Sequence, residues 1–233
     1  MNLFYQPQLS DGIFFLDAEE SRHCVKVLRN KPGDSINITD GKGSFYTATI
    51  TEADPHQCTF RIVDTKKEIR KAYSIHIAIS PTKNADRIEW FVEKSVELGV
   101  DEITLLNCEH TERTFIKTER LQKVAVSAMK QSLKTTLPLI HGVQKFTDVV
   151  RNTKASSKFI GFVDDGNPHH LKDVASPASE YILLIGPEGD FSSVELSLAL
   201  ESGFQKVSLG SSRLRTETAG IAGCHILNLV NTK

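Results

Sequence analysis

A glycine-rich turn is the segment of this sequence best suited to binding a ligand. It reads Ile185-Gly186-Pro187-Glu188-Gly189-Asp190-Phe191-Ser192 and directly follows the apolar run 181–184. Two glycines around a proline turn let backbone amides approach a ligand without obstruction by a Cβ atom. Ligands of α/β domains bind beyond the carboxyl ends of parallel strands, where this turn would lie. The segment is a candidate ligand site, although an isolated turn of this composition is also typical of a plain strand-to-helix connection.

Two glutamates near this turn receive different interpretations. Ser192 and Glu195 form the pattern S-x-x-E of a capping box, whose side chains satisfy amides at a helix start, so Glu195 is assigned a structural role. Glu188 lies inside the turn and has no capping partner nearby in the sequence. It is therefore a candidate for ligand contact.

A charged loop, residues 209–219, is the second candidate site. It follows an apolar run and leads into an expected helix, which Thr216 or Thr218 could cap. Arg215 and Glu217 would stand at the mouth of that helix, where an apolar core does not accommodate unpaired charge. The pair is a candidate for chemistry, with a structural salt bridge as the alternative.

Cations recur at helical spacing in two other segments. Arg22, Lys26 and Arg29 fall at i, i+4 and i+7, on one face of an expected helix. In residues 117–134, five cations stand against one carboxylate. The stripe at helical spacing there consists of Arg120, Lys123, Lys130 and Lys134. On a chain of net charge −1, this asymmetry suits contact with nucleic-acid phosphates, and a solvated helix face is the alternative.

The first part of the chain reads as short strands joined by tight turns. The expected strands are 35–39, 44–51 and 58–63, each rich in β-forming residues. One helix interrupts them, opened by Asp17 as N-cap with Glu20 three residues later and stopped by Pro32-Gly33. This pattern predicts a small β-barrel with one helix.

The pattern changes after the charged stretch 66–71, so we expect one domain over residues 1–72 and another over 73–233. In the second, strand-like runs alternate with amphipathic helices, which predicts an α/β domain with a mainly parallel sheet. The expected strands are 75–79, 103–106, 158–163, 181–185 and 206–209, and the expected helices are 85–99, 117–133, 193–202 and 219–230. The last helix consists of small and apolar residues, among them Ala222, Ile226 and Leu229, and is therefore expected to be buried.

Composition limits the class of protein. Apolar residues are 39% and charged residues 24% of the 233, as in an ordinary soluble globular protein. The four cysteines lack a C-x-x-C pair, and neither a leader-like start nor an apolar run of membrane-spanning length occurs. We therefore expect a cytoplasmic protein with reduced thiols and no membrane contact. His23 beside Cys24 has no second pair at ligand spacing, so no metal site is expected.

The two candidate loops together resemble the bacterial ribosomal RNA small-subunit methyltransferase E family, of the SPOUT superfamily. Six segments occur in the family's order along the whole chain: 21–29 (SRHCVKVLR), 93–100 (EKSVELGV), 111–113 (TER), 131–132 (QS), 186–189 (GPEG) and 214–219 (LRTETA). The resemblance implies an N-terminal PUA-like β-barrel and a C-terminal α/β domain with a parallel sheet and a deep trefoil knot, a rare exception to unknotted topology. It also implies a homodimer whose active site is completed across the interface.

In that family the cofactor S-adenosylmethionine (SAM) lies bent in the knot, which implies contacts from three loops here. The implied cofactor residues are Phe162, Val163, Ile185, Gly186, Pro187, Glu188, Gly189, Leu209, Gly210, Leu214, Thr216, Thr218 and Ala219. The residues assigned to RNA contact are Arg22, Lys26, Arg29, Arg113, Arg120, Lys123, Lys130 and Lys134.

The resemblance further implies methylation of a uridine N3 in the decoding region of 16S ribosomal RNA, on the small ribosomal subunit. The imide proton must leave so that the nitrogen lone pair can attack a methyl group held in line. The resulting negative charge spreads to the ring carbonyl oxygens, where a fixed cation lowers the barrier. Arg215 is expected to be that cation. Glu217 is a candidate proton acceptor, but it is equally suited to orient Arg215 while water takes the proton.

Three residues depart from the family pattern. Asp190 stands where glycine is usual, and aspartate tolerates the left-handed backbone conformation better than most residues. Lys130 and Lys134 stand where glutamate and arginine are expected, and lysine cannot form the bidentate fork that arginine makes with a phosphate. Two alternatives stay open: a SPOUT enzyme that modifies a ribose 2′-oxygen or a tRNA base, and a noncatalytic RNA-binding adaptor, against which the intact cofactor loops count.

Overall fold

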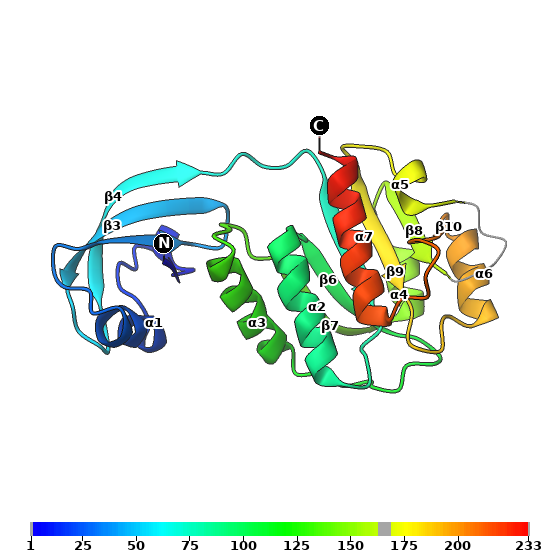
Figure 1. Cartoon of the computed structure of the whole chain (residues 1–233), viewed down its shortest axis with the longest axis horizontal. Coiled ribbons are helices and arrows are strands. Elements are labelled where there is room, and N and C mark those ends of the chain that lie inside the picture. Colours follow the sequence, from blue (N-terminus) through cyan, green and yellow to red (C-terminus); the bar gives the residue numbers. More distant parts are fainter. Residues whose placement is uncertain (1, 163–168, 233) are drawn as a thin grey trace. The chain divides into compact units, whose positions relative to one another are not determined.

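The computed structural model describes residues 2–162 and 169–232. Its contacts divide the chain into two compact units, which are described separately (Figure 1). The first unit comprises residues 1–70 and 126–137, and the second comprises 71–125 and 138–233. We expected two independent domains that meet after residue 72, and this stays a prediction.

The first unit is built on a four-stranded sheet. Its strands, in spatial order, are β1 (Leu3–Tyr5), β2 (Ser35–Thr39), β3 (Ser44–Glu52) and β4 (Thr59–Lys67). The first pair is parallel and the other two pairs are antiparallel. The sequence pattern did not predict β1. A short 3-10 helix, Leu9–Asp11, follows this strand. Apolar side chains such as Phe4 and Ile38 form a buried core on this sheet.

The helix of this unit is shorter than expected and changes its winding. The side chain of Asp17 accepts the Glu20 N–H at 2.8 Å, which confirms Asp17 as the N-cap of α1 (Ala18–Arg22). A π-helical segment, η2 (His23–Val27), follows directly and ends at Leu28. The helical run therefore stops before Pro32-Gly33, and its wider π-helical turn replaces the α-helical spacing assumed from the sequence.

The second unit holds a six-stranded sheet. In spatial order its strands are β10 (Gln205–Val207), β8 (Ser157–Gly161), β9 (Glu180–Ile185), β5 (Ser74–Ile79), β6 (Glu102–Asn107) and β7 (Leu139–Lys145). All five neighbouring pairs are parallel, which confirms the expected sheet. Five strands occur where apolar runs predicted them, whereas β7 was missed because its sequence is largely polar.

Helices cover both faces of this sheet (Figure 1). The helices that lie wholly within this unit are α2 (Ala85–Leu98), α4 (Phe146–Asn152), α5 (Leu171–Val174), α6 (Ser193–Glu201) and α7 (Thr216–Val230). A further helix, α3 (Thr118–Gln131), begins in this unit and belongs to the first unit from residue 126 onward. Ile182 and Leu184 belong to the core under α4 and α6, whereas Leu183 between them faces α7, as strand alternation requires. Among the described residues, no helix is long and apolar enough to cross a membrane.

Glycines set the packing of α7 against the sheet. A Cβ atom on Gly220 would lie 2.5 Å from the Phe91 ring, so only glycine permits this approach. The expectation that this helix is buried is confirmed, since Gly220, Gly223, Cys224 and Leu227 of α7 are buried. Its buried face is the one with the glycines, while Leu229 is 55% exposed. Side-chain volume rather than hydropathy decides the buried face, because the smallest residues allow the closest contact.

A charged pair is largely buried inside the first unit. The ammonium group of Lys130, near the end of α3, pairs with Oε1 of Glu20 on α1. Glu20 is buried, which raises its pKa, while the hydrogen bond and charge of Lys130 lower it in part. The other oxygen, Oε2, is buried without a hydrogen-bond partner among the described residues. Lys130 is thus engaged inside this unit, at a position where the family pattern led us to expect glutamate.

We predict that Lys130→Met destabilises the protein by about 3 kcal/mol at pH 7, because it leaves a buried carboxylate without a counterion. Removing the ammonium raises the pKa of folded Glu20 further, so the cost appears as pH rises through that pKa. At the ordinary value of 4.5 the unfolded carboxyl group is half protonated and the folded one is mostly protonated, so the cost shrinks, and it vanishes well below that pH. Urea unfolding at pH 7 and pH 4.5 measures this, with Glu20→Gln/Lys130→Met as the control that loses the pH dependence. An equal loss at both pH values would contradict the assignment.

Candidate functional site

Hydrogen bonds connect the segments that follow β5, β6 and β9 at the carboxyl edge of the second unit's sheet. The backbone N–H of Ser80, after β5, donates to the carbonyl of Ile185 at the end of β9, at 2.9 Å. The hydroxyl of Ser80 lies 2.8 Å from that of Thr111, in the loop after β6. Three chain segments far apart in sequence are thereby held at one edge, which is where α/β domains bind ligands.

The glycine-rich turn is tightly packed on its own residues. A Cβ on Gly186 would lie 3.2 Å from the Phe191 ring and 3.3 Å from Asp190 Oδ1. Asp190 has φ of 61°, and its N–H donates to the carbonyl of Pro187 at 3.0 Å. The expectation that aspartate can take the left-handed conformation at this position is confirmed.

The two glutamates differ as expected in their surroundings. Ser192 and Glu195 form the complete capping box at the start of α6, so the structural role of Glu195 is confirmed. Its Oε1 also accepts the Glu109 N–H at 2.9 Å, which joins the turn to the loop after β6. Glu188 is exposed and lies 3.3 Å from the Lys83 N–H. It remains accessible to a ligand.

The charged loop keeps its shape through glycine and a serine turn. Gly210 has φ of 134°, a conformation that favours glycine, and open space surrounds the position of a Cβ. Its N–H donates to the hydroxyl of Ser208 at 3.2 Å. The preceding Leu209 is half-buried.

The third expected cofactor loop begins at Phe162. Phe162 packs against the buried core, and its N–H donates to the carbonyl of Val207 in β10 at 3.3 Å. Val163, the other residue assigned to this loop, lies outside the described residues. The structure therefore places one of the two predicted contacts, beside the start of the charged loop.

A buried hydrogen bond joins the two main loops. The hydroxyl of Thr216 donates to the carbonyl of Gly186 at 3.1 Å. Arg215 is the N-cap residue of α7 and makes no side-chain cap. The expectation that Thr216 or Thr218 caps the helix was wrong, because both lie within α7 and the Thr216 hydroxyl is used between the loops instead.

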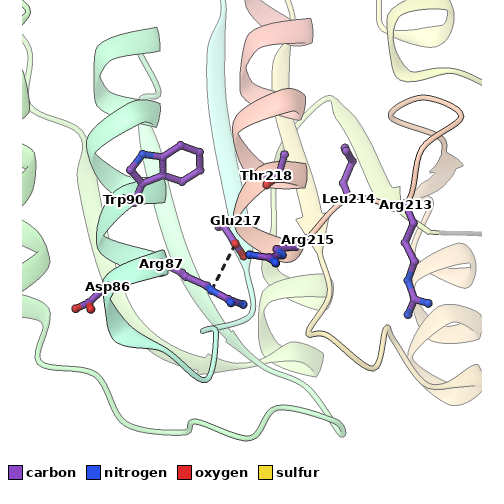
Figure 2. A pocket seen from close by; sticks show the side chains of 8 residues that line it. All are labelled: Asp86, Arg87, Trp90, Arg213, Leu214, Arg215, Glu217 and Thr218. Atoms are coloured by element: carbon purple, nitrogen blue, oxygen red, sulfur yellow. Dashed lines mark ion pairs between the residues drawn. The ribbon is translucent and has the colours of Figure 1, made fainter.

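The start of α7 opens onto a pocket of about 580 Å³. Figure 2 shows its lining side chains, which come from α2, the charged loop and α7. They are Asp86, Arg87, Trp90, Arg213, Leu214, Arg215, Glu217 and Thr218. Of the residues predicted for chemistry, Arg215 is exposed and Glu217 is buried. Both predicted residues therefore line one pocket, beside two of the loops expected to hold a cofactor.

Three residues of α2 line this pocket, Asp86, Arg87 and Trp90, and none of them was identified from the sequence. Arg87 places its Nε 3.8 Å from Oε1 of Glu217, which is the ion pair marked in Figure 2. The sequence had suggested Arg215 as the partner of Glu217. Trp90 is 45% exposed and lies on the same side of α2, one turn later. No local pattern distinguishes Arg87 or Trp90 from other residues of an amphipathic helix.

The loop after β6 was also underestimated by sequence reasoning. His110 Nδ1 lies 3.0 Å from the carbonyl oxygen of Asp190. A Cβ on Gly189 would lie 3.3 Å from the His110 Cβ, so the histidine packs directly on the glycine-rich turn. Arg113, one of the predicted RNA contacts, donates to the Lys83 carbonyl at 3.4 Å. The motif Thr111-Glu112-Arg113 was the only signal for this loop.

The predicted cationic face of the first helix is only partly formed. Arg22 and Lys26 are exposed on the α1 and η2 segments. Arg29 is exposed as well, but it lies beyond the helix end with φ of 60°. The predicted α-helical stripe of three residues was wrong in its geometry, because the π-helical turn and the early helix end alter their spacing.

The stripe on α3 is similarly reduced. Arg120 pairs with Glu89, Nε to Oε1 at 2.6 Å, and Lys130 pairs within the first unit. Lys134 follows the helix, after Leu133 takes a left-handed conformation. Lys123 is exposed on the helix itself. The expectation of four equivalent cations on one helical face was wrong, since tertiary ion pairs and the helix end separate them.

The pocket's composition suits the stabilisation of a planar anion. Guanidinium groups donate in a fixed fork, and Trp90 offers an aromatic face on which a planar ring can stack. The adjacent loops offer glycine backbone and the apolar Leu214 for a larger ligand. Within residues 2–162 and 169–232, no group of three or more His, Cys, Asp or Glu side chains is placed to hold a metal ion.

Comparison with known proteins agrees with this architecture. The RNA methyltransferase domain family matches residues 70–228, and the RNA methyltransferase PUA domain matches residues 16–63. The chain is 26% identical over 231 residues to the ribosomal RNA small subunit methyltransferase E of Aquifex aeolicus, covering 97% of this chain and 99% of that protein.

Solved structures extend the similarity. A probable rRNA methyltransferase from Porphyromonas gingivalis superimposes with a TM-score of 0.94 and 42% identity, over 99% of this chain and 98% of that one. The ribosomal RNA small subunit methyltransferase E of Neisseria gonorrhoeae, solved with bound S-adenosyl methionine, has a TM-score of 0.86 and 28% identity over the same shares. The family match covers the whole sheet and the pocket, so the chain belongs to the RNA methyltransferase family, with the PUA domain of these enzymes in its first unit.

Proposed function

We propose that this protein transfers a methyl group from SAM to N3 of a uridine in 16S rRNA of the small ribosomal subunit. The observation that carries the proposal is the shared pocket of Arg215 and Glu217 beside the bonded glycine-rich and charged loops. The similarity to methyltransferases named for small-subunit ribosomal RNA, one of them solved with bound SAM, supports it. We further propose that it acts in the cytoplasm, where these subunits are assembled.

The residues present fit SAM as a cofactor. Gly210 has open space where a side chain would otherwise stand, so its backbone can approach a ligand closely. The cofactor-binding residues that we propose on these loops are Ile185, Gly186, Pro187, Glu188, Gly189, Leu209, Gly210, Leu214, Thr216, Thr218 and Ala219, with Phe162 and Val163 from the third loop. Bound SAM supplies an activated methyl group on its sulfonium sulfur.

The pocket residues then position and activate the uracil ring. Arg215 donates to a ring carbonyl oxygen, on which negative charge develops as N3 loses its proton. Trp90 stacks on the face of the ring and excludes water from it. Arg87 holds the Glu217 carboxylate through their ion pair. The carboxylate in turn orients the guanidinium group of Arg215. The proton leaves to Glu217 or to water.

We also propose that the protein acts as a homodimer and that its second unit is knotted. The apolar side chains of Ala222, Ile226 and Leu229 recur at i, i+4 and i+7 on α7, outside its buried face. A second copy would cover this face, which explains why an apolar stripe remains accessible in a single chain. The knot is supported by the resemblance to the SPOUT superfamily.

The RNA contacts that we propose are cations of both units. Those of the first unit are Arg22, Lys26, Arg29 and Lys134, and those of the second are Arg113, Arg120 and Lys123. Arg113 and Lys134 are partly buried, and the other five are exposed. Lys130 was assigned to the same set, and its ion pair with Glu20 favours a structural role instead.

The product of the reaction tests the function directly. Purified protein, SAM and small ribosomal subunits that lack the modification should yield uridine methylated at N3, identified by mass spectrometry of nucleosides against standards. A ribose 2′-O-methyl product, or methylation of tRNA alone, would support the enzyme with another target. Failure to bind SAM in an isothermal titration would support the noncatalytic adaptor.

We predict that Arg215→Lys lowers the single-turnover rate about 100- to 1,000-fold, the usual cost of losing one well-placed oxyanion donor. Lysine keeps the charge but loses the planar fork, so SAM affinity should change little. Arg213→Lys is the matched control, because Arg213 lines the same pocket from the same loop and should leave the rate near wild type. Normal turnover of the Arg215 variant, or a loss that merely follows SAM affinity, would assign Arg215 to binding.

We predict that Arg22→Gln/Lys26→Gln weakens RNA binding and reduces its salt dependence, while SAM affinity stays unchanged. Two lost phosphate contacts reduce the slope of log affinity against log salt by about 1.4 to 1.8. The pair Lys31→Gln/Lys42→Gln removes equal charge from exposed sites outside the helix and is the control. An unaltered slope in the helix variant, or equal changes in both, would show that the helix carries no specific contact.

A further inference from the structure

Two cysteines meet in the core of the first unit. Cys24 lies in the π-helical segment η2, and Cys58 directly precedes β4. Both are fully buried in the same apolar cluster. All four cysteines of the chain are described, and none of them is in a disulfide. The pair is separated in sequence but adjacent in space, so local sequence does not reveal it.

The backbone around Cys58 is fixed to the face of the helix that carries Cys24. The Cys58 N–H donates to the hydroxyl of Ser21 at 2.8 Å, and its carbonyl accepts the Leu16 N–H at 2.9 Å. Ser21 and Cys24 are three residues apart, so their side chains lie on neighbouring positions of one helix face. These bonds hold the two cysteines together in the folded state.

Cys24 and Cys58 belong to one buried apolar cluster, and the side-chain amide of Asn30 donates to Cys24 Sγ at 3.3 Å. Interaction with the Cys58 thiol lowers the pKa of Cys24, and Asn30 lowers it further against the effect of burial. The pKa of Cys58 is raised by Cys24 and by burial. Burial alone acts in the opposite direction at Cys108, whose pKa rises to about 12. The amide donor of Asn30 stabilises a thiolate on Cys24, which makes Cys24 the nucleophile of the pair.

We propose that Cys24 and Cys58 form a redox site, which peroxide converts reversibly into an intramolecular disulfide. The Cys24 thiolate attacks one oxygen of hydrogen peroxide and breaks the O–O bond, which leaves a sulfenic acid on Cys24. The Cys58 sulfur then attacks the Cys24 sulfur and displaces the hydroxyl group, which leaves as water with the Cys58 proton. In sum, two thiols lose two electrons and two protons, and peroxide becomes two waters.

A disulfide between Cys24 and Cys58 would change the rigidity of the first unit. Both sulfurs are buried, so oxidation proceeds through local opening of the short α1 and η2 segments. Once formed, the bond ties this helical run to the start of β4 and closes a loop on the order of 35 residues, which restricts the unfolded chain. Arg22 and Lys26 lie on the same helical run, so the state of the pair controls how rigidly those cations are held. This inference does not rest on the proposed reaction.

Oxidation of the full-length protein by hydrogen peroxide tests the proposal. The thiol count under denaturing conditions should fall from four to two, with the mass lower by two hydrogen atoms. Peptide mapping without reductant should identify a bridge between Cys24 and Cys58, and dithiothreitol should restore all four thiols. The melting temperature should rise on oxidation and return on reduction.

Matched variants separate this pair from the other two cysteines. Cys108→Ser/Cys224→Ser should still form the bridge, whereas Cys24→Ser and Cys58→Ser should each abolish it. Retention of four thiols, a bridge to another cysteine or another copy, or oxidation of Cys24 to a sulfinic acid without a bridge would overturn the proposal. Because the peptide map is made on the wild-type protein, the result stands even if a serine variant fails to fold.

Discussion

The buried hydrogen bond from the Thr216 hydroxyl to the Gly186 carbonyl is the contact on which the candidate site depends. It joins the start of α7 to the end of β9, so that two loops separated by a whole strand and helix share one edge of the sheet. A buried carbonyl that loses its donor costs about 1 to 3 kcal/mol, which makes the junction costly to open. One turn further along the same helix face, the close packing of Gly220 on Phe91 holds α7 in place.

This junction decides where charge is placed. Glu217 is 7% exposed at its side chain, a position that an isolated carboxylate would not tolerate. Arg87 from α2 supplies the compensating charge, while Arg215 stays exposed at the N-cap. The pocket therefore combines an anchored carboxylate with an accessible guanidinium group. That combination is suited to a substrate whose negative charge appears only during the reaction, because preorganised donors need not rearrange as the charge develops.

The sequence by itself determined the features that depend on neighbouring residues. Strand and helix alternation predicted the parallel sheet, because apolar runs of strand length and amphipathic runs of helix length each have a local signature. The N-cap at Asp17, the capping box of Ser192 and Glu195, and the left-handed Asp190 were predicted because each follows from side-chain chemistry within a few residues. The family motifs marked both loops of the pocket.

Only the tertiary structure decided which distant groups meet. Arg87 with Glu217 and Glu20 with Lys130 are each separated by more than a hundred residues, and nothing local selects one such partner over another. The predicted basic stripe on the first helix was wrong for a related reason. A π-helical turn is stabilised by packing in the core, and no residue type in the sequence indicates it. The sequence predicted that α7 is buried, but only packing decided which of its faces is buried, because close helix–sheet contact selects the smaller side chain. Pairing, register and close packing depend on the summed geometry of the whole unit, and that geometry exists only once the chain has folded.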